Sequence, residues 1–191
     1  MDAGPDAMLF PFGRRRPSPA RLLLDRLHSE IVGAVRRPEF YLDYGVPDTF
    51  EGRFELLALH AGLVLRRFNA AAAPGPAIAQ DLVDVVFAHL DADLREAGVG
   101  DITVPKRMKR LCEAFLGRSA AYDAALRLGP DALAAAVARN VYAGLDAGRA
   151  GRMARYVEAA SAALAAAALD ACIAGPLPFP DPSSIPARNS L

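Results

Sequence analysis

One histidine and one carboxylate in this 191-residue sequence are spaced so that together they could bind a metal. His89 and Asp93 are four residues apart, which places both on one face of a helix, as a two-ligand site requires. The surrounding sequence supplies no third ligand, and no Glu-x-x-His pair is present to build a di-iron bundle. We therefore predict no metal, and the acidic residues of this segment are interpreted as a solvent-facing surface.

The two cysteines, Cys112 and Cys172, fall in different predicted helices and form no CxxC pair, which argues against a zinc site and a disulfide scaffold. Arg110 precedes Cys112 closely enough to lower the pKa of its thiol, but a small buried core residue is the preferred interpretation. The sequence has no G-x-S-x-G, P-loop or dinucleotide-binding glycine motif. We predict neither an enzymatic activity nor a cofactor.

The strongest polar feature is the run VPKRMKR, which places Lys106, Arg107, Lys109 and Arg110 in the first two turns of a predicted helix. Positive charge at a helix N-terminus opposes the helix dipole and is unfavourable for stability. These four residues are therefore more typical of a binding surface than of a stabilising feature. One interpretation is a solvated face neutralised by the acidic segment before it; the other is a surface for ribosomal RNA, lipid headgroups or an acidic protein. The 22 basic and 22 acidic residues balance, so no DNA binding is predicted.

Apolar residues recur three and four positions apart along an alanine-rich chain without a strand pattern, which predicts an all-α fold. The expected architecture is a single-domain bundle of about six helices with extended N- and C-terminal tails. We divide the chain into a flexible basic N-terminal tail (1–17), a helical domain (18–175) and a Pro-rich C-terminal tail (176–191). The predicted helices cover about 19–37, 49–68, 78–97, 105–129, 131–145 and 149–174, with one further turn at 39–42.

The element with the clearest start and the most apolar surface is the helix predicted over 49–68. Asp48, followed three residues later by Glu51, is typical of a capping box. Phe50 and Phe54 begin one apolar stripe, and leucines fill much of the remaining circumference. A helix that is apolar on most sides is predicted to lie at the centre of the bundle.

Neither terminus contains a targeting or membrane-spanning signal. The apolar piece of the N-terminus precedes its arginines, the reverse of a secretory signal, and no apolar stretch reaches the length needed to cross a bilayer. A cytoplasmic location is therefore predicted, with peripheral attachment at the inner face of the cytoplasmic membrane as an extension of it.

Three stretches, YGVPDTFEGRFELLALHAGLVLRRF, VGDITVPKRMKRLCEAFLGRSAAYDAAL and the YV…GPLPFP ending, resemble the ubiquinol-cytochrome c chaperone family. The likeness spans about 22–180. It implies an all-helical, non-enzymatic assembly factor that helps newly made cytochrome b mature into the ubiquinol-cytochrome c reductase. Mitochondrial members work with a small partner subunit near the ribosomal tunnel exit. This chain lacks an Arg-rich, acid-poor presequence, which suggests a bacterial form.

The resemblance extends to a GRF…LH motif that contains Arg53 and His60, seven residues apart and so near one helix face. We expect these two to form a mixed apolar and cationic surface for a partner segment, or to pack against the Asp48 loop. The alternative is a buried Arg53 satisfied by Asp43, Asp48 or a carbonyl. The run from Lys106 to Arg110 is expected to dock on acidic headgroups, ribosomal RNA or a charged loop of cytochrome b.

Two other function classes stay open from the sequence. A helical ligand-binding domain would take a quinone, lipid or haem-like molecule between its central helices. An enzyme would use His60 or His89.

Overall fold

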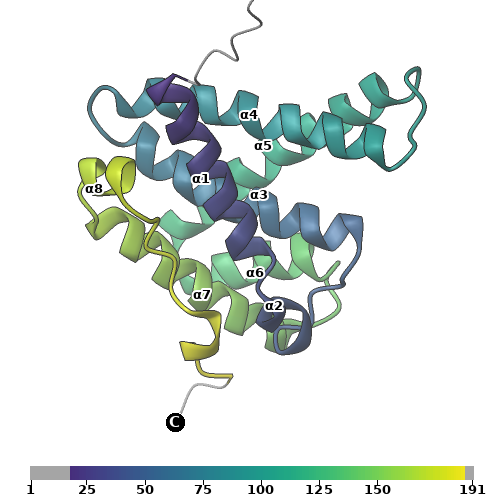
Figure 1. Cartoon of the computed structure of the whole chain (residues 1–191). Coiled ribbons are helices and arrows are strands. Elements are labelled where there is room, and N and C mark those ends of the chain that lie inside the picture. The colour runs from purple at the N-terminus through teal and green to yellow at the C-terminus, as the bar shows by residue number, and fades with distance from the viewer. Residues whose placement is uncertain (1–17, 188–191) are drawn as a thin grey trace, which may run out of the picture.

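The computed structural model describes residues 18–187, so the predicted tail at 1–17 lies outside the described residues, as do residues 188–191. The described residues form eight α-helices and a short 3-10 helix, with no strand among them (Figure 1). The elements are α1 (Pro19–Val35), α2 (Pro38–Leu42), α3 (Phe50–Asn69), α4 (Gly75–Glu96), α5 (Val104–Leu128), α6 (Pro130–Val141), α7 (Ala147–Ala166), α8 (Leu169–Ala174) and η1 (Pro182–Ser184). The prediction of an all-α single domain is confirmed.

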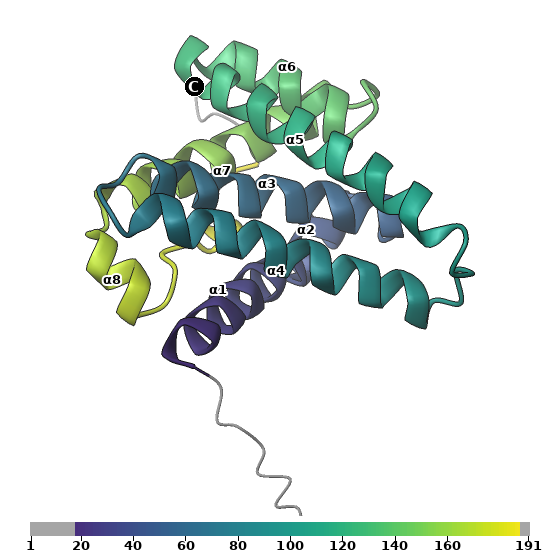
Figure 2. The same cartoon turned by 90° about the horizontal axis from the view of Figure 1, so that it is seen from above.

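The centre of the fold is α3, as its sequence predicts. Its buried positions cover almost the whole circumference, and α1, α4, α5, α6 and α7 all contact it. Figure 2 shows α1 and α4 on one side of α3 and the pair α6 and α7 on the other. Large buried side chains such as Leu56, Leu59 and Phe68 fill the space between these helices. A helix buried on all sides therefore supplies the core that the others share.

The helix predicted over 149–174 is divided in the structure into α7 and α8. The break lies at Ala167, whose backbone is extended with ψ of 135°. Arg67 of α3 donates to the carbonyl oxygens of Leu164 and Ala167, each 2.8 Å away, and so satisfies groups that a continuing helix would have bonded. The local sequence is almost all alanine and carries no stop signal. The contacts that accompany the break come instead from Arg67 on another helix.

The hairpin of α4 and α5 projects beyond the other helices in both views (Figures 1 and 2). Residues 97–103 form the turn at its end. No helix within residues 18–187 combines the length and the apolar content needed to cross a bilayer.

Residues 175–187, here called the C-terminal segment, are extended as predicted but pack against the body of the protein. Leu177 and Pro182 are buried. Glu30 of α1 accepts a hydrogen bond from the Leu177 amide at 2.6 Å, and the Tyr44 hydroxyl donates to the Pro182 carbonyl at 2.8 Å. This part of the chain thus packs against the folded helices.

Candidate partner-binding surface

Phe50 opens α3 and keeps 40% of its surface exposed. The helix begins there because the Thr49 hydroxyl accepts a hydrogen bond from the Gly52 amide, 3.1 Å away. The cap is therefore Thr49, one residue after the predicted Asp48. Gly52 is required at this turn, since a Cβ would lie 2.0 Å from the Pro47 carbonyl oxygen. Cap and glycine together fix the start of α3 and leave Phe50 at the surface.

A cavity of about 270 Å³ lies between the start of α3 and the start of α5. Phe50, Phe54 and Leu111 form its apolar wall, and Arg107 and Arg110 contribute positive charge. The rest of the lining is Glu51, Glu55, Ala114 and Arg118. Within residues 18–187 neither Arg107 nor Arg110 forms an ion pair. Available guanidinium groups beside an apolar wall fit a segment that carries a carboxylate close to apolar side chains.

A second cavity, of about 220 Å³, lies on the other side of Phe50 and Phe54, between α1, α3 and α4. Its lining is Val32, Val35, Arg36, Phe50, Arg53, Phe54, Leu57, Leu90, Asp93 and Ala97. Phe50 and Phe54 belong to both cavities, so they form a continuous apolar ridge between two hollows. We call this ridge and its two hollows the Phe50 groove.

Arg53 lies at the surface, with 59% of its side chain exposed. Its Nε donates to Asp48 at 2.7 Å, and this hydrogen bond lowers the pKa of the Asp48 carboxyl. Of the two interpretations, the one in which Arg53 packs against the Asp48 loop agrees with the structure. The one in which Arg53 is buried does not. Because the pair is fully solvated, its contribution to stability is small.

His60 is fully buried, so the expected surface that combines Arg53 with His60 does not exist. The His60 imidazole lies 2.8 Å from the Leu56 carbonyl and 2.9 Å from the Tyr156 hydroxyl, and both ring nitrogens are occupied. Burial lowers the pKa of His60 to about 4, so the ring is neutral at pH 7. The seven-residue spacing misled the prediction because α3 is enclosed along its middle, while its first turn, with Arg53, reaches solvent.

The four basic residues at the start of α5 face two directions. Arg107 and Arg110 line the Phe50 groove. Lys106 and Lys109 are exposed and do not line it, and Lys109 has only a long contact of 3.9 Å to Glu113. The structure therefore brings Arg107 and Arg110 together with Phe50 and separates them from the two lysines.

A partly buried ion pair that sequence reasoning missed lines the groove. Arg118 donates to both carboxylate oxygens of Glu55, with its Nε 2.9 Å from each and its Nη2 2.7 Å from Oε1. This hydrogen bonding raises the pKa of Arg118. Glu55 is 8% exposed, so the pair holds α3 and α5 together at the base of the groove. A separation of 63 residues leaves no local sequence signal for it.

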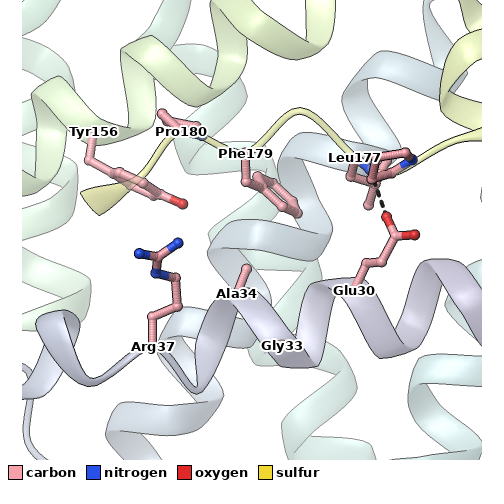
Figure 3. Close-up of a pocket in the computed structure, with 9 residues that line it drawn as sticks. Glu30, Gly33, Ala34, Arg37, Tyr156, Leu177, Phe179 and Pro180 are labelled. Atoms are coloured by element: carbon pink, nitrogen blue, oxygen red, sulfur yellow. Dashed lines mark hydrogen bonds between the residues drawn. The ribbon is translucent and has the colours of Figure 1, made fainter. Parts of the chain in front are cut away.

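A further pocket, of about 360 Å³, lies between α1, α7 and the C-terminal segment. Figure 3 shows Glu30 of α1 facing Leu177 at one end and Arg37, which directly precedes α2, facing the Tyr156 ring at the other, with Phe179 between them. Arg37 is already paired with Asp181 at 2.8 Å. The polar groups here mainly hold the C-terminal segment in place.

A larger groove, of about 850 Å³, runs between α3, α4 and α5. Leu65, Phe87, Phe115 and Leu116 supply apolar surface, and the buried Ser119 hydroxyl has no hydrogen-bond partner among the described residues. Cys112 lines the same groove and is partly exposed, whereas Cys172 is buried.

His89 packs against another histidine. Its ring stacks on His28 of α1 with centroids 4.0 Å apart and an angle of 11° between the planes. Across residues 18–187 no three His, Cys, Asp or Glu side chains are grouped so that they could hold a metal ion. Burial and the neighbouring His89 lower the pKa of His28 to about 4.

Comparisons with known proteins agree on one family. A family model described as "Ubiquinol-cytochrome C chaperone" matches residues 42–179. A solved structure, described as the crystal structure of the Cbp3 homolog from Brucella abortus, matches with a TM-score of 0.80 and 37% sequence identity. That match covers 88% of this chain and 94% of the other. No curated protein sequence matches this chain.

Proposed function

The chain belongs to the ubiquinol-cytochrome C chaperone family, and on this basis we propose that it is a non-enzymatic assembly factor for newly made cytochrome b of the ubiquinol-cytochrome c reductase. The observation that carries the proposal is the Phe50 groove, where the partly exposed Phe50 lies beside two arginines without an ion-pair partner in the described chain. Cytochrome b and the cytoplasmic location are parts of this proposal.

The chemistry of the groove fits the proposed client. Cytochrome b is a membrane protein whose apolar helices aggregate in water, so a helper needs apolar surface that covers them for a limited time. Phe50 offers such surface, while Arg107 and Arg110 recognise a carboxylate on the same client segment. Cationic groups at the rim also speed encounter with an acidic segment.

The proposal is tested by affinity purification of the tagged protein from gently solubilised cells, followed by mass spectrometry over a series of salt concentrations. Enrichment of cytochrome b without the mature reductase is expected, with a yield that falls as salt rises. If cytochrome b is absent from every eluate, the proposal fails.

Matched variants assign the interaction to the groove. Phe50→Asp and the double change Arg107→Gln with Arg110→Gln are expected to lower cytochrome b recovery by about tenfold or more, since each removes a central contact. The control is Lys106→Gln with Lys109→Gln, which removes the same charge from the face outside the groove. Equal losses in both double variants would show a general charge effect and remove the groove from the model.

The ligand-binding alternative is favoured by one observation, the 850 Å³ groove with its unpaired Ser119 hydroxyl. A quinone, lipid or haem-like molecule would place its apolar part on Phe87 and Phe115. Native mass spectrometry of the purified protein tests this idea directly: one recurring small molecule without cytochrome b would put the alternative first.

A further inference from the structure

The tip of the α4–α5 hairpin projects from the body of the protein (Figures 1 and 2). It also carries an apolar side chain that is almost free of contacts, and it is basic on one flank. We propose that this tip, formed by residues 98–103 of the turn together with Lys106 and Lys109, docks on an anionic lipid surface, with Ile102 inserted between the headgroups and Lys106 and Lys109 against their phosphates. The inference concerns a different surface from the Phe50 groove and does not depend on the identity of the client.

Ile102 is 97% exposed, although the turn that carries it is well anchored. Thr103 and Val104 donate backbone hydrogen bonds to the Gly100 carbonyl at 2.8 and 3.2 Å, and Val104 is fully buried. The turn is thus closed on itself. Ile102 is presented to solvent without rearrangement, so little ordering would be needed when it enters an interface.

The charges of the hairpin are divided between its two helices. Asp101 and Asp91 both pair with Arg95, each at 2.6 Å, so the acidic side is partly neutralised within itself. Lys106 and Lys109 project from α5, within about 10 Å of the helix start at 1.5 Å per residue. Each lysine near an anionic lipid surface strengthens binding by about fivefold at physiological salt. The α5 flank is therefore the side that faces the lipid.

An isoleucine beside lysines favours lipid over the other anionic partners. RNA would use the positive charges but would gain little from an aliphatic side chain, whereas the membrane interface accommodates both. Leu145, which is also exposed, lacks this combination because it precedes the exposed ion pair of Asp146 and Arg149.

The chain contains no tryptophan, which gives a direct optical test. Full-length Ile102→Trp protein is mixed with vesicles of phosphatidylcholine and phosphatidylglycerol, and with vesicles of phosphatidylcholine alone. Its fluorescence is expected to shift to shorter wavelength only with the anionic vesicles. The matched control, Leu145→Trp, places the same fluorophore at an exposed site in the loop between α6 and α7 and should not shift.

Vesicle sedimentation then separates the apolar and electrostatic contributions. Ile102→Asp is expected to weaken binding about tenfold or more, and Lys106→Gln with Lys109→Gln by roughly ten- to thirtyfold, while Leu145→Asp binds as the unmodified chain does. All four substituted positions are exposed, so the circular dichroism spectrum and the melting temperature of each variant should be unchanged. The proposal is overturned if the unmodified protein ignores anionic vesicles, if Ile102→Asp binds equally well, or if an RNA competes for the lysines while no vesicle binds.

Discussion

The His60 imidazole and the Tyr156 hydroxyl lie 2.9 Å apart in the core and join α3 to α7. The Leu56 carbonyl can only accept, so Nδ1 of His60 carries the proton and donates to it at 2.8 Å. Nε2 of the neutral ring then accepts from Tyr156. One tautomer of His60 therefore satisfies both neighbours, which makes this residue a structural element of the core.

Tyr156→Phe should destabilise the protein by about 1–3 kcal/mol, because it leaves Nε2 of His60 buried without a donor. Urea unfolding measures the loss. The matched control is Tyr41→Phe, which removes a hydroxyl bonded to the Val35 carbonyl at a partly exposed site where water can replace it. If the two substitutions cost the same, burial of the His60 pair is not what makes Tyr156 important.

Acid should unfold the protein in a window set by its low-pKa histidines. The pKa of His60 is about 4 in the folded state, against 6.5 for the ordinary side chain, so the unfolded chain binds the proton first. Stability is complete above pH 6.5 and falls as the pH drops towards 4, by up to roughly 3 kcal/mol for His60 alone. Burial of His28 adds a smaller loss in the same direction, since that ring is half exposed to solvent.

His60→Gln separates this effect from the titration of carboxylates. The variant should be less stable at neutral pH, yet its stability should depend less on pH between about 6.5 and 4. Chemical unfolding at several pH values gives both slopes. Parallel curves for the variant and the unmodified chain would exclude His60 as the titrating group.

Arg118→Gln is expected to destabilise the protein by about 2 kcal/mol, because the Glu55 carboxyl would lose its hydrogen-bonding partner at a nearly buried position. The same change at Arg127, which pairs with Asp123 at the surface, should cost less than about 0.5 kcal/mol. Thermal melts of the two variants test the contrast. A small loss at Arg118 would show that solvent already screens the pair.

Gly52→Ala and Gly117→Ala should act in opposite directions. The first introduces a Cβ 2.0 Å from the Pro47 carbonyl oxygen, so the loop must move and the Phe50 groove loses its shape. The second meets no atom within 4 Å in the middle of α5 and should stabilise the protein by about 0.5–1 kcal/mol. Melting temperatures give the signs, and a neutral Gly52→Ala would contradict the rigid turn described for this loop.

Glu30→Ala should loosen the C-terminal segment while leaving the helices folded. The carboxylate accepts from the Leu177 amide and from Arg26 Nη1, each at 2.6 Å, and thereby ties the segment to α1. Limited proteolysis should cut residues 175–187 earlier in this variant than in Glu113→Ala, an exposed acidic control on α5. Equal digestion would mean that apolar contacts such as Leu177 hold the segment without help.

The helices were predictable because their signals are local. Ser18, followed by Pro19, is a local start signal, and its hydroxyl accepts from the Arg21 amide at the start of α1. The helix α5 runs from Val104 to Leu128, within one residue of the predicted ends. The sequence pattern predicted Asp48 as the cap, one residue before the Thr49 that the structure uses, and local rules do not choose between neighbours. The structure uses Thr49 because Asp48 is engaged by Arg53.

The candidate surface was predictable only in part, because its features depend on partners far along the chain. The GRF…LH spacing could not reveal that Tyr156 would enclose His60. In the same way, nothing near Arg107 in the sequence indicates that it lies across a cavity from Phe50. Residue types thus predicted a cationic and apolar surface, whereas tertiary packing decided which residues form it.

The bonds between α1 and the C-terminal segment also bear on how the molecule is made. Arg26 and Glu30 reach partners 146 to 149 residues later in the chain. During synthesis α1 emerges well before the residues that cover its outer face. Closure of that face is therefore a late step that follows translation of Leu177, and contacts of such long separation form slowly. The protein proposed to bind a newly made client therefore has a late folding step of its own, during which this face of α1 is uncovered.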